Sequence, residues 1–238
     1  MIFTVGEWDE RGRTIGEIAA SMRTSTPAVS DLVRRLTDAG LAKHEPYGDV
    51  ALTDAGLSRA LAMVRRHRLI ETFLVSELGY RWDEVHDEAE VLEHAISDLM
   101  VDRIDTRLGH PWRDPHGDAI PTSDGVLHLP MARPLAALAE GEQGFIVRIF
   151  DDDPRLLQWF SQHDISLDAS VTVRAHKPFG GALEVGLGQG SDLTVVDLGI
   201  QAVTSLWVGE SPPLTDGATS SGCHYTDCRH ISAATPTP

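Results

Sequence analysis

The chain is an acidic polypeptide of 238 residues, in which 36 Asp and Glu face 20 Lys and Arg, giving a net charge of −16. Its 42% hydrophobic and 24% charged content is typical of a globular protein with a packed core and excludes a disordered polymer. No stretch approaches the roughly 18 consecutive apolar residues of a transmembrane helix, and the first residues lack a signal-peptide pattern. We therefore expect a cytoplasmic protein with no membrane partner, and its two cysteines predict no disulfide framework.

The charge is distributed unevenly along the chain. Residues 1–70 have a balance of +1, residues 71–130 of −10 and residues 131–238 of −7. Such asymmetry indicates that the segments meet different partners. We expect a polyanion at the head and cations in the middle.

The first 64 residues predict a small helical unit. Thr14 and Glu17 fit a capping box, which opens a first helix. A second helix, with Thr26 as N-cap and Pro27 at its first position, ends at Gly40. Two short helices with a tight connection have the proportions of a helix-turn-helix, whose second helix enters the major groove of DNA.

A predicted β-hairpin follows, because residues 41–45 and 49–52 flank a Pro-Tyr-Gly turn. Helix, helix and hairpin in that order make a winged helix. Its candidate DNA contacts are small and polar groups that reach base edges and arginines that reach phosphates. They are Ser25, Thr26, Pro27, Ala28, Ser30, Asp31, Arg34, Arg35 and, on the hairpin, Tyr47.

Beyond the hairpin the pattern predicts long helices and then a β-rich module. Thr53 and Asp54 cap a helix to about residue 78, and another helix is expected from about residue 82 toward residue 108. Residues 109–134 are predicted to form a loop. The expected fold class is mainly α with small β parts, in four segments: a winged helix over 1–64, a metal-binding and dimerisation domain over 65–134, an SH3-like β-barrel over 141–210 and a disordered tail over 211–238.

Potential metal ligands gather on one predicted helix. At about 100° per residue, one sector holds polar side chains and a separate sector holds apolar ones. The polar sector comprises His86, Glu90, Glu93, His94 and Ser97, and the apolar sector comprises Val85, Ala89, Leu92, Ile96 and Leu99. On the preceding helix, His67 and Glu71 lie four residues apart, so they can share one ion.

This mixture of Glu and His has a simple alternative, a solvated helix surface. Carboxylates crowded on one stripe repel one another unless a cation lies between them, which favours a metal site. Carboxylate and imidazole ligands without sulfur suit Mn²⁺, Fe²⁺ or Zn²⁺, and a carboxylate-rich set favours Mn²⁺.

The winged helix, the His67 and Glu71 pair and the run from Val85 to His94 together resemble the diphtheria-toxin-repressor family of metal-dependent transcriptional regulators, most closely its manganese-responsive branch. The resemblance implies that His67, Glu71 and His86 belong to one metal site, and that the other site contains Glu90, Glu93 and His94. Glu90 stands where iron-responsive relatives place a cysteine. The resemblance also puts Asp153 near an acidic residue that the SH3-like domain contributes.

The start of the chain departs from the family pattern. Residues 1–4 match the middle of the family's first helix, so a further metal ligand is expected upstream of Met1. We interpret this as a start codon assigned too far downstream or as a weakened switch.

We therefore predict a homodimeric, manganese-dependent repressor without catalytic activity that binds operator DNA and controls metal-uptake genes. Two alternatives stay open: a metal-dependent hydrolase with a His and Glu di-metal centre, and a metal-independent winged-helix repressor with a small organic effector. A zinc site in the tail is a weaker possibility; its ligands would be Cys223, His224, Cys228 and His230. The glycines from Gly186 to Gly190 do not fit a dinucleotide fingerprint.

Overall fold

The computed structural model describes residues 2–8, 13–45, 48–151, 153–178, 181–188, 190, 193–214 and 222–233. The chain divides into two compact units. The first contains residues 1–64 with 123–126 and 232–238, and the second contains residues 65–122 and 127–231.

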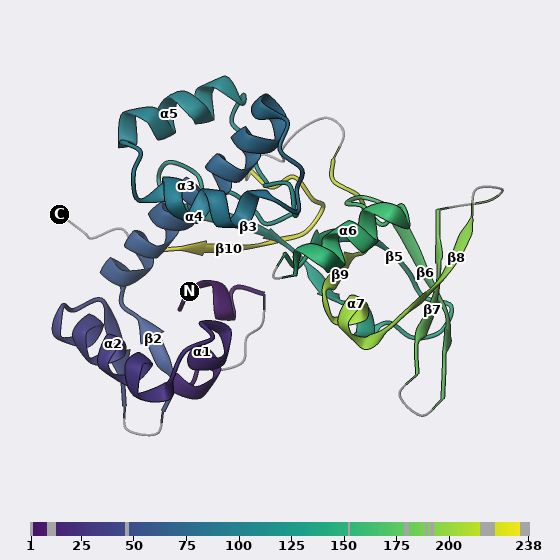
Figure 1. Cartoon of the computed structure of the whole chain (residues 1–238), viewed down its shortest axis with the longest axis horizontal. Helices are drawn as coiled ribbons and strands as arrows, with labels where there is room; N and C mark the ends of the chain where they lie inside the picture. The colour runs from purple at the N-terminus through teal and green to yellow at the C-terminus, as the bar shows by residue number, and fades with distance from the viewer. Residues whose placement is uncertain are drawn as a thin grey trace. The chain divides into compact units, whose positions relative to one another are not determined.

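Helices occupy the first half of the chain and strands most of the second (Figure 1). The helical elements are η1 (Thr4–Gly6), α1 (Ile15–Ser21), α2 (Thr26–Asp38), α3 (Asp54–Leu78), α4 (Val85–Glu93), α5 (Asp98–Arg107), η2 (Leu135–Ala137), α6 (Pro154–Gln162) and α7 (Ile200–Thr204). The strands are β1 (Ala42–His44), β2 (Val50–Leu52), β3 (Val126–Pro130), β4 (Ala132–Pro134), β5 (Gln143–Ile149), β6 (Ser170–His176), β7 (Leu183–Leu187), β8 (Thr194–Leu198), β9 (Leu206–Gly209) and β10 (Cys228–Ser232).

The first unit has the predicted order of helix, helix and hairpin. The capping box of Thr14 and Glu17 opens α1, as predicted. The N-cap of α2 is Ser25, whose hydroxyl accepts the Ala28 N–H at 3.4 Å, so the prediction of Thr26 is wrong by one residue. Both residue types cap well, and only the extended backbone of Ser25 decides between them.

The hairpin is the antiparallel pair β1 and β2. Its apolar residues join those of α1 and α2 in one core, which contains Ile2, Ile18, Ala19, Val29, Val33, Ala42 and Val50. Pro46 and Tyr47, at the predicted turn, lie outside the described residues. The N-terminal residues that were matched to an α-helix form only the 3-10 turn η1 where the structure describes them.

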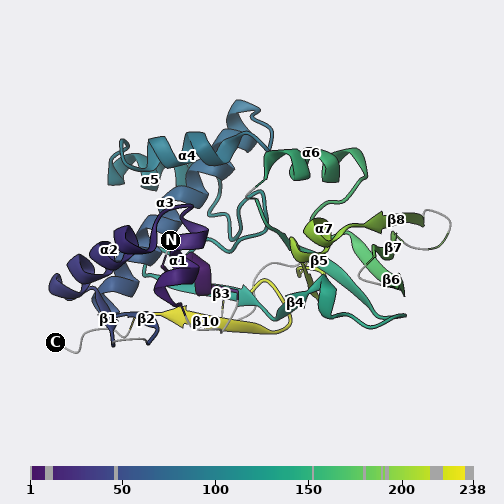
Figure 2. The same cartoon turned by 60° about the horizontal axis from the view of Figure 1, so that its bottom comes forward.

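Two helices replace the single helix that was predicted from residue 82 to residue 108 (Figure 2). The chain leaves α4 at His94, and the Ser97 hydroxyl accepts the Met100 N–H at 3.3 Å to start α5. A serine next to an acidic residue is a strong helix start, and it interrupts the apolar periodicity. Leu99 is therefore 65% exposed rather than buried.

The β-rich part of the second unit is a six-stranded antiparallel sheet with the order β4, β9, β5, β6, β7 and β8. Its core combines the apolar faces of β5 to β9 with Leu157 and Phe160 of α6. Asp153 caps α6 and His163 ends it, which confirms the helix predicted over residues 153–163.

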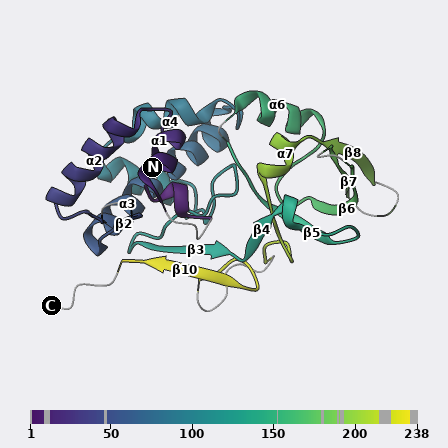
Figure 3. The ribbon, with the colours of Figure 1, turned by 90° about the horizontal axis from the view of Figure 1, so that it is seen from below.

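Two segments predicted to be irregular contain strands. The segment 109–134 includes β3 and β4, and the tail includes β10, which pairs with β3. Figure 3 shows the arrows of β3 and β10 side by side in opposite directions. The prediction of a disordered tail is thus wrong for residues 222–233, where Cys223 and Cys228 form a disulfide. None of the described helices has the length and apolar character needed to span a membrane.

Candidate metal centre

Glu71 lies at the centre of a cluster of imidazoles and carboxylates in the second unit. On α3, the Nε2 of His67 donates to Glu71 Oε1 at 3.0 Å, because residues one turn apart face the same way. The other ring nitrogen, Nδ1, donates to Glu93 Oε2 of α4 at 2.8 Å. Burial favours the neutral imidazole, but the two carboxylates outweigh it and raise the pKa of His67 to about 9.

His86 brings a second imidazole from the first turn of α4. Its Nδ1 lies 3.4 Å from Glu71 Oε1 and 3.2 Å from Asp151 Oδ2, and these two carboxylates raise the pKa of His86 to about 11. Burial alone would raise the pKa of Glu71, whose side chain is 2% exposed, but His67 and His86 lower it to about 2. Without a metal, the cluster is thus held together by protons on its imidazoles.

His116 contributes from a loop rather than from a helix. This loop is an Asx turn, in which Asp114 Oδ1 accepts the N–H of His116 at 2.8 Å and that of Asp118 at 3.0 Å. The loop lies tightly on β5, because the His116 carbonyl accepts the Ile149 N–H at 2.9 Å. Gly117 has a φ of +92°, and a Cβ there would lie 2.2 Å from the Val147 carbonyl oxygen. Glycine is therefore required at this position.

The buried ring of His116 points a nitrogen at two carboxylates. Its Nε2 donates to the Trp82 carbonyl at 2.8 Å, so in the neutral ring Nδ1 carries the lone pair. Nδ1 lies 4.0 Å from Glu71 Oε2 and 3.8 Å from Asp151 Oδ2, and has no hydrogen-bond partner among the described residues. An unsatisfied buried nitrogen facing two carboxylates fits a bound cation.

The ligand atoms form two groups that share Glu71. Those of His67, Glu71 and His86 all lie within 4.8 Å of one another, as do those of Glu71, His116 and Asp151. Glu93 contacts His67, so we add it to these five residues. We call the resulting set the Glu71 cluster: His67, Glu71, His86, Glu93, His116 and Asp151. Its donors are nitrogen and oxygen only.

Fixed positive charges lie beside the two aspartates of the loop that carries His116. The Arg68 guanidinium is buried and lies 3.7 Å from both Asp114 and Asp118, while Arg148 of β5 lies 2.7 Å from Asp118. Even so, burial and the charges of Asp118 and Glu71 raise the pKa of Asp114 to about 8. Ionising Asp114 at neutral pH would be favoured by a further cation nearby.

The structure brings together four of the seven predicted ligands, namely His67, Glu71, His86 and Glu93. His94 lies at the end of α4 with its side chain 70% exposed, where it contacts Glu93 at 3.3 Å. Glu90 is exposed and belongs to neither group of ligand atoms. Because α4 ends at Glu93, the expected polar sector loses Ser97 from the helix and keeps His94 only at its end.

The structure places Asp151, rather than the predicted ligand Asp153, beside the other candidate ligands. The Asp153 carboxylate accepts the Arg155 N–H at 3.0 Å and caps α6, whereas Asp151 enters the cluster. Sequence reasoning also missed His116. The signals were present as an Asp-Pro-His-Gly-Asp turn and an Asp-Asp-Asp run after an apolar strand, but neither motif has a period that points to a partner.

All the candidate DNA contacts that the structure describes are exposed on α2 or at its start: Ser25, Thr26, Pro27, Ala28, Ser30, Asp31, Arg34 and Arg35. Asp31 forms an ion pair with Arg34 and lies 3.3 Å from the Arg35 Nε. Tyr47 lies outside the described residues.

Two family models match the chain. Residues 53–122 match the iron dependent repressor metal binding and dimerisation domain, and residues 133–200 match the FeoA domain.

Individual proteins are similar over longer stretches. A solved manganese-dependent transcriptional repressor in complex with manganese is 48% identical, with a TM-score of 0.82 over 88% of this chain and 96% of that one. The manganese regulator SloR is 30% identical, with a TM-score of 0.72 over 88% and 95%. The iron-dependent repressor IdeR of Mycobacterium leprae is 36% identical over 128 residues, which are 53% of this chain and 54% of that protein. The match thus spans about half the length of the curated relatives.

Proposed function

This chain belongs to the diphtheria-toxin-repressor family of metal-dependent transcriptional regulators, and we propose that it is a manganese-dependent repressor that binds operator DNA as a homodimer. The observation that carries the proposal is the Glu71 cluster, in which carboxylates converge with a buried imidazole nitrogen that has no hydrogen-bond partner among the described residues. The expectation of a non-enzymatic protein agrees with the relatives reported above, which are named as repressors or regulators.

Manganese fits the donor set better than softer metals do. The cluster offers three carboxylates and three imidazoles, and hard oxygen ligands suit Mn²⁺ while thiolates select zinc or copper. Fe²⁺ and Zn²⁺ also accept imidazole and carboxylate, so they are the competing ions. The solved relative with bound manganese supports the same choice.

When bound, a divalent ion would supply positive charge that replaces the protons on the imidazoles. The residues that hold it come from separate elements: α3, α4, the loop of His116 and the segment after β5. His67 and His86 would then be neutral, and the ion would balance the charge of the neighbouring carboxylates. Bound metal would therefore add contacts that join these separate elements, which is the requirement for a metal-dependent switch.

The exposed side of α2 supports DNA binding by the first unit. Arg34 and Arg35 share Asp31 as their partner, and both guanidinium groups are well exposed. Phosphate groups can therefore compete for them at little cost, because exposed ion pairs contribute little stability. The helix length and the following hairpin fit a winged helix whose α2 enters the major groove.

Exposed apolar side chains on α4 and α5 support a dimer. Val91, Leu99 and Met100 are 68%, 65% and 47% exposed, and exposed apolar side chains of this size are candidates for an interface. They fall within the residues that match the metal binding and dimerisation domain.

The test is a gel shift on duplex DNA from upstream of the chain's own gene and of metal-uptake genes. We expect Mn²⁺ to produce a shift that EDTA abolishes, with Fe²⁺ and Zn²⁺ as comparisons. The Glu71→Gln variant should not shift, while Glu90→Gln should, because Glu90 lies outside the cluster. A shift that EDTA leaves unchanged would favour a metal-independent repressor, and no shift under any condition would contradict the proposal.

A further inference from the structure

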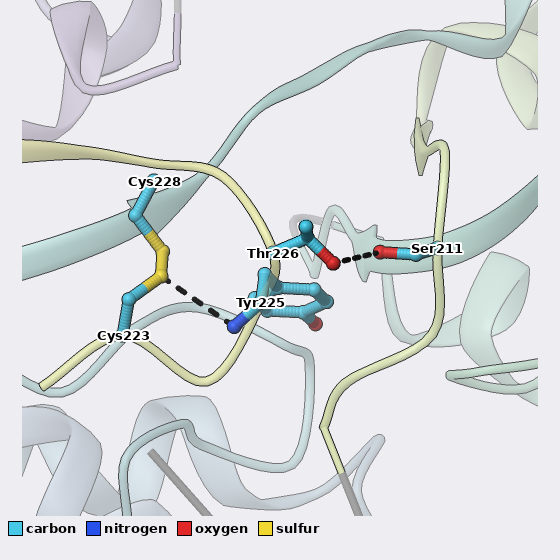
Figure 4. The surroundings of a disulfide bond; sticks show 5 residues. All are labelled: Ser211, Cys223, Tyr225, Thr226 and Cys228. Carbon is cyan, nitrogen blue, oxygen red and sulfur yellow. Dashed lines mark hydrogen bonds between the residues drawn. A yellow bond between two sulfur atoms is a disulfide. The ribbon is translucent and has the colours of Figure 1, made fainter. Parts of the chain in front are cut away.

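The C-terminal segment of the second unit packs against strand β5. Cys223 and Tyr225 are 3% and 4% exposed, and they form a small core with Val147 of β5, to which Trp112 and Trp207 also pack. Figure 4 shows the disulfide between Cys223 and Cys228 closing a loop around Tyr225, whose N–H donates to Cys223 Sγ at 3.4 Å. The same loop is anchored by Thr226 to Ser211.

This disulfide-closed segment contacts the loop that carries His116. The ring of His224 stacks on Trp112 with centroids 4.7 Å apart, and the ring of Tyr225 meets Trp112 edge-on with centroids 5.4 Å apart. Arg113, the next residue along, places its guanidinium over Trp112 at 4.6 Å and donates to Asp168 at 2.8 Å. Trp112 is thus held from several sides.

The other end of the same loop positions His116, which belongs to the Glu71 cluster. Asp114, two residues after Trp112, fixes the amides of His116 and Asp118. The Trp112 carbonyl accepts the Ile120 N–H at 2.9 Å, which closes the loop upon itself. Val147 contacts both the C-terminal segment and the loop, because it packs against Cys223 and Tyr225 and its carbonyl faces Gly117. Displacing the segment around Tyr225 would therefore loosen the loop that positions His116.

We propose that the Cys223–Cys228 disulfide is a redox-sensitive latch that holds the loop of residues 112–118 in its ligand-positioning conformation. The proposal rests on the metal centre proposed above, and assigns Trp112, His224 and Tyr225 as positioning residues for His116. Reduction by an external dithiol transfers two electrons and two protons to the disulfide. The S–S bond breaks, Cys223 and Cys228 become thiols, and the dithiol becomes a disulfide.

Reduction weakens the latch because the closed loop is short. Opening it returns conformational freedom to His224 and Tyr225 and to the backbone between the two cysteines, so the stacked arrangement on Trp112 is populated less. Outer partners of metal ligands change metal affinity by roughly 10- to 100-fold. Since the latch acts through the loop, we expect the lower end of that range, an increase of about tenfold in the Kd for Mn²⁺.

The experiment compares the oxidised protein with the protein reduced by a water-soluble tertiary phosphine. The phosphine takes up the oxygen of one water molecule, whose two hydrogens become the thiol protons. Mn²⁺ is titrated into each form by calorimetry. Hydrogen exchange of the His116, Gly117 and Asp118 amides is measured on the metal-free forms, and we expect it to be roughly tenfold faster after reduction.

Cys228→Ser is the matched variant, because it breaks the disulfide and leaves the buried Cys223 in place. It should behave like the reduced wild type and should not respond to the phosphine, which controls for effects of the reductant on Mn²⁺. Equal Kd values or equal exchange rates in the oxidised and reduced wild type would overturn the latch. Absence of Mn²⁺ binding in both forms would instead overturn the proposed metal centre, and the exchange rates would still decide whether the disulfide holds the loop.

Discussion

The Glu71 cluster takes its side chains from two kinds of structure, regular helices and irregular loops. His67, Glu71, His86 and Glu93 project from α3 and α4, where helical spacing alone sets which of them are neighbours. His116 and Asp151 come from the turn before β3 and from the segment after β5, and hydrogen bonds to β5 and to Trp82 fix the turn that carries His116. The ligands on α3 and α4 are positioned by the helices themselves. The ligands on the loops are positioned only when the β-rich region is folded.

This difference indicates where a switch can be controlled. Helical ligands that hydrogen-bond to one another, such as His67 with Glu71, remain close whether or not the rest of the cluster is complete. His116 makes no such bond to the cluster, and its Nδ1 stays 3.8 Å from Asp151. A divalent ion is therefore expected to draw the loop part toward the helical part.

The largest effect is expected at Glu71, which both parts share. Glu71→Gln removes a carboxylate from both groups of ligand atoms, so the affinity for Mn²⁺ should fall by at least about 100-fold, beyond the usual effect of outer partners. Calorimetric titration measures this. The matched control is Glu90→Gln on the exposed side of α4, and an equal loss in both variants would show that the helix carries the site by general charge.

The next effect concerns the loop itself. Gly117→Ala puts a Cβ against the Val147 carbonyl at a positive φ, and should lower the free energy of unfolding by about 2 kcal/mol or more. Gly109→Ala is the control, because Gly109 has a φ of +73° but open space around it. Chemical denaturation of the metal-free variants checks this. Similar losses would mean that backbone conformation alone, and not contact with β5, determines the requirement for glycine.

The neighbouring aspartates after β5 distinguish a ligand from a helix cap. Asp151→Asn should weaken Mn²⁺ binding by at least about tenfold, because losing a direct ligand costs no less than losing an outer partner of a ligand. Asp153→Asn should leave Mn²⁺ binding unchanged, because asparagine caps a helix as well as aspartate does. Titrations of both variants under one set of conditions are the measurement. A larger loss for Asp153→Asn would restore the ligand predicted from the sequence.

The smallest effect is a dependence of stability on pH in the metal-free protein. His67 has a pKa of about 9 in the folded chain against 6.5 as its ordinary value, so its stabilising contribution is complete below pH 6.5 and is lost as pH rises through 9. Asp114, raised to about 8, acts in the same direction.

We therefore expect the Tm in EDTA to fall by roughly 2–8 °C between pH 6.5 and 9.5, as a loss of one or two kcal/mol would produce. Calorimetry of the wild type and of His67→Gln provides the test, since the variant should show a smaller fall. A Tm that rises over this range would contradict the protonated state assigned to the cluster.

Local patterns were sufficient for much of the fold and for the helical half of the site. Capping at Thr14 and at Thr53 predicted helices that the structure contains. The i, i+4 pair of His67 and Glu71 was predicted from helical spacing. In each case the relevant partners lie within one or two turns of each other, so sequence distance and spatial distance agree.

The remaining features depend on contacts between distant segments. Nothing near Asp151 in the sequence indicates that it meets His86, and Asp153 only two residues later is chemically identical. The strand β10 forms because β3 offers it an edge, so the composition of the tail alone was misleading. Such choices follow from tertiary packing, which a single sequence does not display.

The central claim is that a divalent ion binds where the helical and loop parts of the Glu71 cluster meet. The most direct test is an anomalous difference map from crystals of the protein grown with Mn²⁺. The account predicts a peak within coordination distance of Glu71, His116 and Asp151. Peaks confined to Glu90 and His94 on the exposed end of α4, with none beside Glu71, would contradict it.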